Sequence, residues 1–329
     1  MIKSSAPTRI DLAGGTLDIW PLHLFFGNAP TLNAAINLYA TVELIPRKDK
    51  RVILRSQDLN LEASFSSFKA LPDKHPLELL TRTVKFYAPK SGLEISTHCQ
   101  APPGSGIGGS SALNIALHGA LNKFAGARYS KSEMIDIARN IETQVIGVPA
   151  GCQDYFPAMY GNVRAVKPGF MGIDTETLPV KPKELTRHFI LCYTGKPRNS
   201  GINNWEVTKK ALDGDKKVIR LLSAIRDCAL EMHQLLKRGR ISGLAEIFKK
   251  EWKARKQLAP TISTPQMENL IQSALKKGAL AAKVCGAGGG GCVAFVVPPG
   301  KKQSIMDELN IRGGKVLPFQ FVSRGHRNQ

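Results

Sequence analysis

The segment from Pro103 to Ser111, PGSGIGGSS, combines glycines and serines directly before a stretch with helical periodicity. Glycine has no Cβ atom and lets a ligand approach the backbone, while a helix N-terminus presents free N–H groups to an anion. Both properties suit a phosphate group, so this loop is a candidate phosphate cradle. It matches neither the lysine-containing phosphate loop nor the ordinary dinucleotide fingerprint, and a structural turn is the alternative.

Two carboxylates follow this loop. Glu142 lies on a predicted helix, and Asp154 follows a Gly/Pro turn twelve positions later. A carboxylate beside a phosphate site is costly unless a cation neutralises it, so Mg²⁺ bridging Glu142 to nucleotide phosphates would explain the pairing. Asp154 would then be free for a substrate hydroxyl. Alternatively, Glu142 is a solvated helix residue and Asp154 is a turn former.

The N-terminal segment APTRIDLAGGTLD contains a further basic and acidic pair. Arg9 lies on a predicted strand, and Asp18 follows the turn that contains Gly14 and Gly15. An arginine can stabilise charge on a phosphoryl group, and an aspartate after a turn can accept hydrogen bonds from a polyol. A surface strand residue and a helix cap are the alternatives for Arg9 and Asp18.

A second glycine run, CGAGGGGCVAF at 285–295, lies between two apolar segments and includes Gly288 and Gly289. A bulged hairpin turn needs fewer glycines than this run contains. We therefore expect the backbone here to approach a ligand or the other glycine loop closely.

The first half of the chain predicts a mixture of strands and helices that would carry these residues. Alternating or β-branched residues predict strands, and apolar residues at three- and four-residue spacing predict helices. Ser130 and Glu133 form a candidate capping box. The predicted strands are 9–12, 40–44, 51–56 and 93–97, and the predicted helices are 111–124 and 131–146.

The second half begins after a turn-rich stretch, which places a domain boundary near residue 180. The sequence thus predicts an α+β fold with an N-terminal domain (1–180) that carries the phosphate loop and a C-terminal domain (181–329). In the second domain the predicted helices are 204–213, 215–238, 241–257 and 265–277, and the predicted strands are 188–195, 281–285, 291–297 and 316–322.

Composition narrows the class of protein. With 329 residues, 43% of them hydrophobic, the chain can bury a large core, and it has no apolar run of the roughly 20 residues that a membrane span requires. We expect a cytoplasmic protein that does not enter a membrane. Its six cysteines form no C-x-x-C pair, so neither a disulfide framework nor a zinc site is indicated, and we expect reduced thiols. No feature of the sequence indicates an oligomeric state.

The formal net charge of +20 fits two kinds of partner, polyanions such as nucleic acid or small phosphorylated ligands. The basic segments lack the interleaved aromatic residues of a strand-stacking nucleic-acid platform. Nucleic acid is therefore not the expected partner, and a solvated basic surface without a specific partner is the alternative.

Taken together, the motifs resemble the GHMP kinase superfamily of galactokinase, homoserine kinase, mevalonate kinase and phosphomevalonate kinase. APTRIDLAGGTLD, PPGSGIGGSSA and KVCGAGGGGCVAF stand in the family's order. The chain is most similar to the sugar-kinase branch of heptose 7-phosphate kinase and fucokinase, through RIDLAGGTLD, GSGIGGSSAL and YTGKPRNSG (193–201). Leu17 departs from the threonine that those kinases often have, which leaves the sugar open.

The resemblance implies a ribosomal protein S5 domain 2-like N-terminal domain and a ferredoxin-like C-terminal domain, with ATP and acceptor in the cleft between them. Asp154 resembles the catalytic aspartate, and Arg9 the basic residue near the γ-phosphate. Glu142 and Ser111 resemble the Mg²⁺-binding residues, with Ser110 a second candidate. The ATP cradle would be Pro103, Gly104, Ser105, Gly106, Ile107, Gly108, Gly109, Ser110 and Ser111, and the substrate contacts would be Asp18, Gly288 and Gly289.

We therefore expect an ATP- and Mg²⁺-dependent kinase that phosphorylates a hydroxyl of a sugar or sugar phosphate. The anomeric hydroxyl of a substrate like heptose 7-phosphate is favoured, because that branch acts at C1. A mevalonate-type kinase of isoprenoid synthesis is the first alternative, and Arg9 and Asp18 argue against it because they favour a polyol. A non-catalytic nucleic-acid-binding protein on a kinase scaffold is the second, and it would not need Ser111, Glu142 and Asp154 together.

Overall fold

Strand β2 (Thr31–Pro46) is the central strand of the larger of two β-sheets in this computed structural model, which describes residues 1–27, 29–197 and 200–329. One edge of β2 pairs with β1 (Ile2–Ala13), and its other edge pairs with β5 (Leu93–Cys99) and β6 (Val163–Gly169). The sheet is completed by β3 (Val52–Ser56), β4 (Leu61–Phe65), β7 (Gly172–Thr177) and β12 (Arg327–Asn328). Its named pairings are antiparallel except for β3 with β5.

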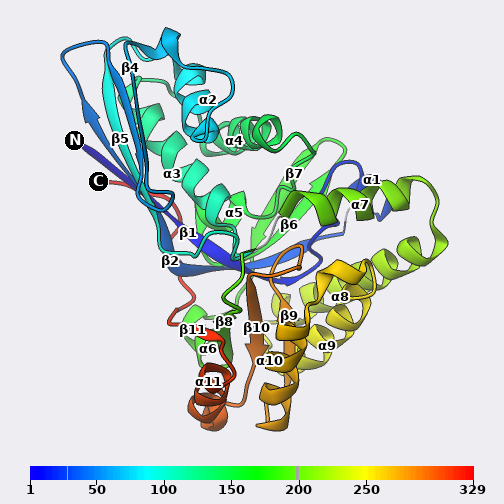
Figure 1. Cartoon of the computed structure of the whole chain (residues 1–329). Coiled ribbons are helices and arrows are strands. Elements are labelled where there is room, and N and C mark those ends of the chain that lie inside the picture. The colour runs from blue at the N-terminus through cyan, green and yellow to red at the C-terminus, as the bar shows by residue number, and fades with distance from the viewer. Residues whose placement is uncertain (28, 198–199) are drawn as a thin grey trace.

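Four helices cover one face of this sheet, as Figure 1 shows: α2 (Glu78–Tyr87), α3 (Gly109–Phe124), α4 (Lys131–Ile146) and α5 (Tyr155–Tyr160). Helix α3 is buried over most of its length, and apolar residues on several of its sides join the core beneath the helices. Its burial fixes the position of its N-terminus, where the first glycine loop ends.

The smaller sheet has four antiparallel strands in the order β11 (Lys315–Leu317), β8 (Phe189–Tyr193), β10 (Cys292–Val296) and β9 (Ala281–Val284). Along β8, Phe189 and Leu191 enter one core, while Ile190 and Cys192 enter another, because successive side chains of a strand point to opposite faces. The longer helices of this half are α7 (Ser200–Leu212), α8 (Lys216–Lys237), α9 (Leu244–Arg255), α10 (Pro265–Lys276) and α11 (Lys302–Ile311). The remaining elements are α1 (Leu22–Phe25), α6 (Pro182–Arg187), η1 (Phe68–Ala70), η2 (Pro260–Ile262) and η3 (Pro299–Lys301).

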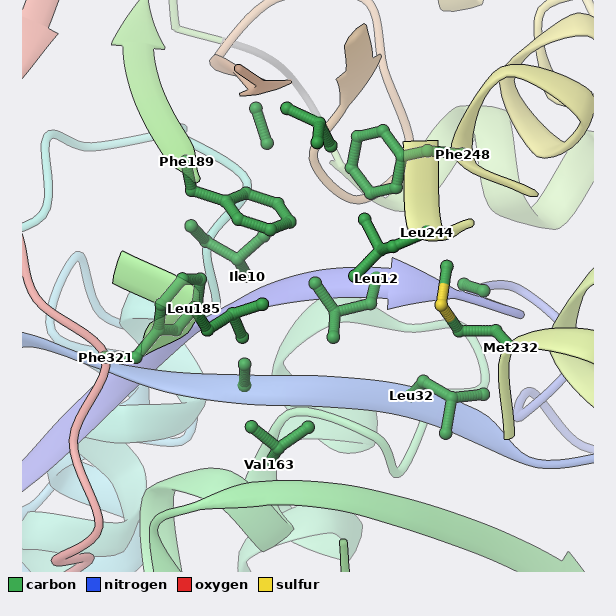
Figure 2. Packing of buried hydrophobic residues seen from close by; sticks show 14 of the residues in the cluster. Ile10, Leu12, Leu32, Val163, Leu185, Phe189, Met232, Leu244, Phe248 and Phe321 are labelled. Carbon is green, nitrogen blue, oxygen red and sulfur yellow. The ribbon is translucent and has the colours of Figure 1, made fainter. Parts of the chain in front are cut away.

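The two sheets share a hydrophobic core. Figure 2 shows Ile10 and Leu12 of β1 close to Phe189 of β8, Met232 of α8 and Phe248 of α9. Burial of these side chains removes apolar surface of both halves from water, so the halves stabilise each other.

A group of buried charged side chains lies beside this core. Lys283 Nζ of β9 lies 2.9 Å from Asp11 Oδ1 of β1 and 3.6 Å from Glu251 Oε1 of α9, and the side chains of all three are 0% exposed. Glu251 Oε1 also accepts from Arg255 Nη2 at 2.5 Å. The four residues therefore alternate in charge and link three elements that are distant in the sequence.

Most of the predicted elements are confirmed, with changes at their ends. The predicted helix 131–146 has the bounds of α4, and the capping box of Ser130 and Glu133 is present. The predicted helix 111–124 corresponds to α3, which begins two residues earlier, and 241–257 corresponds to the shorter α9. The sequence reasoning missed α2 and α11.

The predicted strand 316–322 is wrong beyond Leu317. Pro318 has no N–H to donate to a sheet, and β11 ends before it. The chain then crosses to the larger sheet, where Phe321 forms a bridge with Ile36 and Asn37 N donates to Gln320 O at 2.9 Å. The C-terminal β12 also joins that sheet. The division into domains 1–180 and 181–329 stays a prediction.

The helices of the described residues include none that combines the length and the apolar character needed to cross a membrane.

We predict that Lys283→Ala lowers the free energy of unfolding by about 3–5 kcal/mol, because it leaves the buried carboxylate of Asp11 without its ion-pair partner. Urea unfolding followed by circular dichroism measures the change. The exposed Lys276→Ala is the matched control and should leave the midpoint within error of the native chain. Equal stability of the Lys283 variant and the control would contradict this account.

Candidate active site

A cavity of about 760 Å³ lies where β1, the first glycine loop and the second glycine run meet. It also contains residues of α4, the N-terminus of α5 and the end of α9, so both halves of the chain form its wall. Of the predicted site residues, the wall includes Arg9, Asp18, Pro103, Gly104, Ser105, Gly106, Gly108, Gly109, Ser110, Ser111, Glu142 and Asp154.

The first glycine loop ends at the N-terminus of α3. Gly104, Gly106 and Gly108 have positive φ angles, which glycine adopts at little cost. Gly108 is the N-cap of α3, and no side chain caps this end. The first N–H groups of α3 can therefore donate to an anion in the cavity.

Close packing against the second glycine run holds this loop in place. Cys292 N donates to Ser105 O at 2.7 Å, and a Cβ atom on Gly291 would lie 2.6 Å from the same oxygen. The predicted close approach of the two glycine segments is confirmed at Gly291. A side chain there would force the two loops apart.

Three predicted site residues, Ile107, Gly288 and Gly289, do not line the cavity. Ile107 is fully buried in the core that the two sheets share, although its carbonyl accepts from Arg9 N at 2.9 Å. Gly289 N donates to Ile262 O at 2.9 Å, and a Cβ atom on Gly288 would lie 2.4 Å from that oxygen. The second run lines the cavity through Gly286 and Ala287 instead.

Glu142 connects α4 to the first turn of α3. Its carboxylate accepts from Ser110 Oγ at 2.7 Å and Ser111 Oγ at 3.1 Å, and the Tyr155 hydroxyl also donates to it. Burial raises the pKa of Glu142, and the hydrogen bond from Tyr155 opposes that rise. The carboxylate thus lies in the cavity wall and accepts hydrogen bonds from three hydroxyl groups, and none of these three partners is a cation.

This group of oxygen atoms fits a Mg²⁺ ion. Mg²⁺ binds through oxygen ligands and usually takes only one or two from protein carboxylates, with water and phosphate completing its shell. One carboxylate and two serine hydroxyls at the edge of the cavity match that demand. The described residues include no cluster of three or more His, Cys, Asp or Glu side chains that could hold a metal ion. Within this part of the chain, a metal site made by protein side chains alone is therefore not indicated.

Arg9 and Asp154 form an ion pair in the cavity wall. Arg9 Nε and Nη2 donate to Asp154 Oδ1 at 2.8 and 2.6 Å, and Arg9 Nη1 donates to Gly106 O at 2.8 Å. The arginine thereby ties the aspartate at the start of α5 to the first glycine loop. Both bonds to the carboxylate use Oδ1, so Oδ2 remains available to a ligand. A Cβ atom on Gly108 would lie 3.3 Å from this Oδ2, so a glycine there leaves it accessible.

Asp18 lies on another part of the same wall and is 3% exposed. It accepts from Gln153 N at 2.9 Å, and a Cβ atom on Gly151 would lie only 2.4 Å from its Oδ2. Burial raises the pKa of Asp18 to about 6, against the opposing hydrogen bond from Gln153 N. Its other oxygen, Oδ1, is buried without a hydrogen-bond partner among the described residues.

The sequence reasoning missed Tyr155, Gly151 and Arg255. Tyr155 follows Asp154 directly and Gly151 lies three residues before it, so their proximity in sequence was an available signal. Arg255 comes from α9, and no local pattern places it beside residues 15 and 16. The loops 18–33 and 193–204 are expected to select the acceptor, and Asn28, Arg198 and Asn199 in these loops lie outside the described residues.

Comparisons with known proteins agree with this arrangement. Residues 77–162 match the family model of the GHMP kinases N terminal domain, and residues 232–315 match that of the GHMP kinases C terminal. D-glycero-alpha-D-manno-heptose 7-phosphate kinase of Campylobacter jejuni is 30% identical, over 98% of this chain and 97% of its own. Mevalonate kinase of Thermococcus sibiricus is 24% identical, over 99% of this chain and 98% of its own.

A solved structure shows the same fold. The crystal structure of a D-glycero-D-manno-heptose 1-phosphate kinase from Bacteroides thetaiotaomicron superposes with a TM-score of 0.78 and 24% identity, and the match covers 100% of this chain and 99% of that one. The α+β, two-domain fold expected from the sequence is thereby confirmed.

We predict that Asp18 makes stability depend on pH. Its pKa rises from 3.8 to about 6 on folding, so the folded chain binds more protons than the unfolded chain between these values. The stability that the protonated carboxyl confers is full below pH 3.8 and is lost as pH rises through about 6. The loss should be about 3 kcal/mol, at about 1.4 kcal/mol per pKa unit.

Urea unfolding of the native chain and Asp18→Asn at a series of pH values measures this loss. The variant lacks the titrating group, so its stability relative to the native chain should increase across that pH range. Parallel pH profiles of the two proteins would show that the Asp18 carboxyl does not titrate there.

Proposed function

The chain belongs to the GHMP kinase family, and on that premise we propose that it transfers the γ-phosphoryl group of ATP to a hydroxyl of a sugar phosphate. Members of this family are ATP-dependent phosphotransferases, and this chain is one of them. The acceptor that we favour is a heptose 7-phosphate, phosphorylated at its anomeric hydroxyl. A cytoplasmic location also stays a prediction.

The position of Asp154 is the observation that carries the proposal. Its Oδ1 is held by Arg9, while its Oδ2 stays available beside the phosphate loop. A carboxylate in this position can orient an acceptor hydroxyl and take its proton while the oxygen attacks phosphorus. The new O–P bond would form as the bond between the γ-phosphorus and the β-phosphate oxygen breaks.

The phosphate loop and Arg9 would stabilise the negative charge of the transferring group. The uncapped N-terminus of α3 supplies N–H donors, and Arg9 supplies a guanidinium that is fixed by Asp154 and Gly106 before any ligand binds. Donors that are already in place do not need to reorganise during the reaction.

We propose that Glu142, Ser110 and Ser111 hold Mg²⁺. When bound, the ion supplies positive charge that offsets the negative charge of the nucleotide phosphates. The described cavity wall supports this assignment, because its carboxylates Asp18, Asp58, Glu142 and Asp154 outnumber its guanidinium groups, Arg9 and Arg255. A triphosphate would be poorly accommodated there without a cation.

Asp18 supports a sugar as the acceptor. A buried carboxylate with an unused oxygen can accept hydrogen bonds from the hydroxyl groups of a polyol. Similarity along nearly the whole chain to a heptose 7-phosphate kinase supports the same choice, and the mevalonate kinase is less similar.

Turnover of ATP with a panel of sugars, sugar phosphates and mevalonate tests the proposal. We expect phosphorylation of D-glycero-D-manno-heptose 7-phosphate and no turnover of mevalonate. Asp154→Asn should lower kcat by about 10²- to 10⁴-fold, because an amide cannot take the proton of the hydroxyl. The Asp174→Asn variant, which changes an exposed carboxylate on β7, is the matched control and should keep native turnover.

Near-native kcat of Asp154→Asn would refute the role of Asp154. Turnover of mevalonate alone would favour the isoprenoid kinase. Failure with every acceptor, together with salt-dependent RNA binding, would instead favour the nucleic-acid-binding alternative.

A further inference from the structure

Arg255 lies at the C-terminal end of α9 and reaches the turn that follows β1. It is 2% exposed and forms part of the cavity wall. Its Nη2 donates to Gly15 O at 2.8 Å, and its Nη1 donates to Thr16 Oγ1 at 3.2 Å. One guanidinium from the C-terminal half therefore holds two consecutive residues of the N-terminal half.

The turn that Arg255 contacts has an unfavourable backbone conformation. Thr16 has a φ of +77°, a region that residues with a side chain rarely adopt. Such a conformation persists when surrounding contacts fix it. Leu17 N donates to Gly14 O and Ile19 N donates to Thr16 O, both at 3.2 Å, so the same turn sets the position of Asp18.

The guanidinium of Arg255 is itself held in place. Glu251 Oε1 accepts from Nε at 2.8 Å and from Nη2 at 2.5 Å. Glu251 in turn lies 3.6 Å from Lys283, which pairs with Asp11. Four of the five N–H groups of Arg255 are used in these contacts and in those with Gly15 and Thr16.

We propose that Arg255 is a positioning residue for the acceptor. By holding Gly15 and Thr16 in their strained turn, it keeps Asp18 and the adjoining cavity wall in the geometry that binds the sugar. This inference rests on the proposed function, because it assigns the turn to the acceptor side of the cavity. Selection of the acceptor would then depend on α9, which lies about 240 residues away in the sequence.

Arg255→Lys keeps the positive charge but loses the planar fork, so it cannot hold Glu251, Gly15 and Thr16 together. We expect the KM for heptose 7-phosphate to rise about tenfold, since a small displacement of binding groups has effects of this size. The KM for ATP should change by less than about twofold, because the contacts of the phosphate loop do not involve Arg255.

Thr16→Gly tests whether the turn connects Arg255 to the binding of the acceptor. Glycine adopts a φ of +77° without strain and has no Oγ1 for Arg255 to bind, so the turn then depends less on Arg255. In the Thr16→Gly chain, Arg255→Lys should raise the KM for the acceptor by less than about threefold, a coupling that a double-mutant cycle measures. Lys253→Ala, an exposed cation of the same helix, is the control and should leave both KM values unchanged.

A merely structural role would give a different pattern. It predicts a lower melting temperature with similar losses for ATP and for the acceptor, and that pattern in place of a selective rise in the KM for the acceptor would overturn the inference. If the native chain phosphorylates no sugar phosphate, the proposed function fails, and the inference fails with it. If the native chain is active but Arg255→Lys keeps the native acceptor KM, only the inference fails.

Discussion

The ion pairs on β1 are the constraint on which the rest of the structure depends. Arg9 and Asp11 are two residues apart and so lie on the same face of the strand. Arg9 binds Asp154 and the first glycine loop, while Asp11 pairs with Lys283 of the smaller sheet. A single strand thus connects the reactive carboxylate to both halves of the chain, and the pair of Asp11 and Lys283 is fully buried, where water does not weaken it.

The glycine segments complete the site because they permit close approach. Gly291 lets the second run contact the carbonyl of Ser105, and Gly108 leaves space beside Asp154. Larger residues at these positions would separate the loops or cover the carboxylate. The cavity is therefore formed jointly by ionic bonds that draw the elements together and by glycines that leave room between them.

The sequence predicted those parts of the fold and the site that follow from local pattern. Repeating apolar residues located α4, and residue types and spacing together with the family resemblance located Arg9, Glu142 and Asp154, which lie in the wall of one cavity. Gly288 and Gly289 could not be placed, since glycine permits approach by protein or by ligand alike. The path after Leu317 and the reach of Arg255 depend on partners far away in the sequence, so no local pattern reveals them.

A crystal structure with a non-hydrolysable ATP analogue, Mg²⁺ and heptose 7-phosphate tests the central claim most directly. The account predicts the triphosphate at the N-terminus of α3, the cation at Glu142, and the anomeric hydroxyl within hydrogen-bond distance of Asp154 Oδ2. Asp18 should accept from another hydroxyl of the sugar. A nucleotide bound outside the glycine loop, or a sugar held away from Asp154, would contradict it.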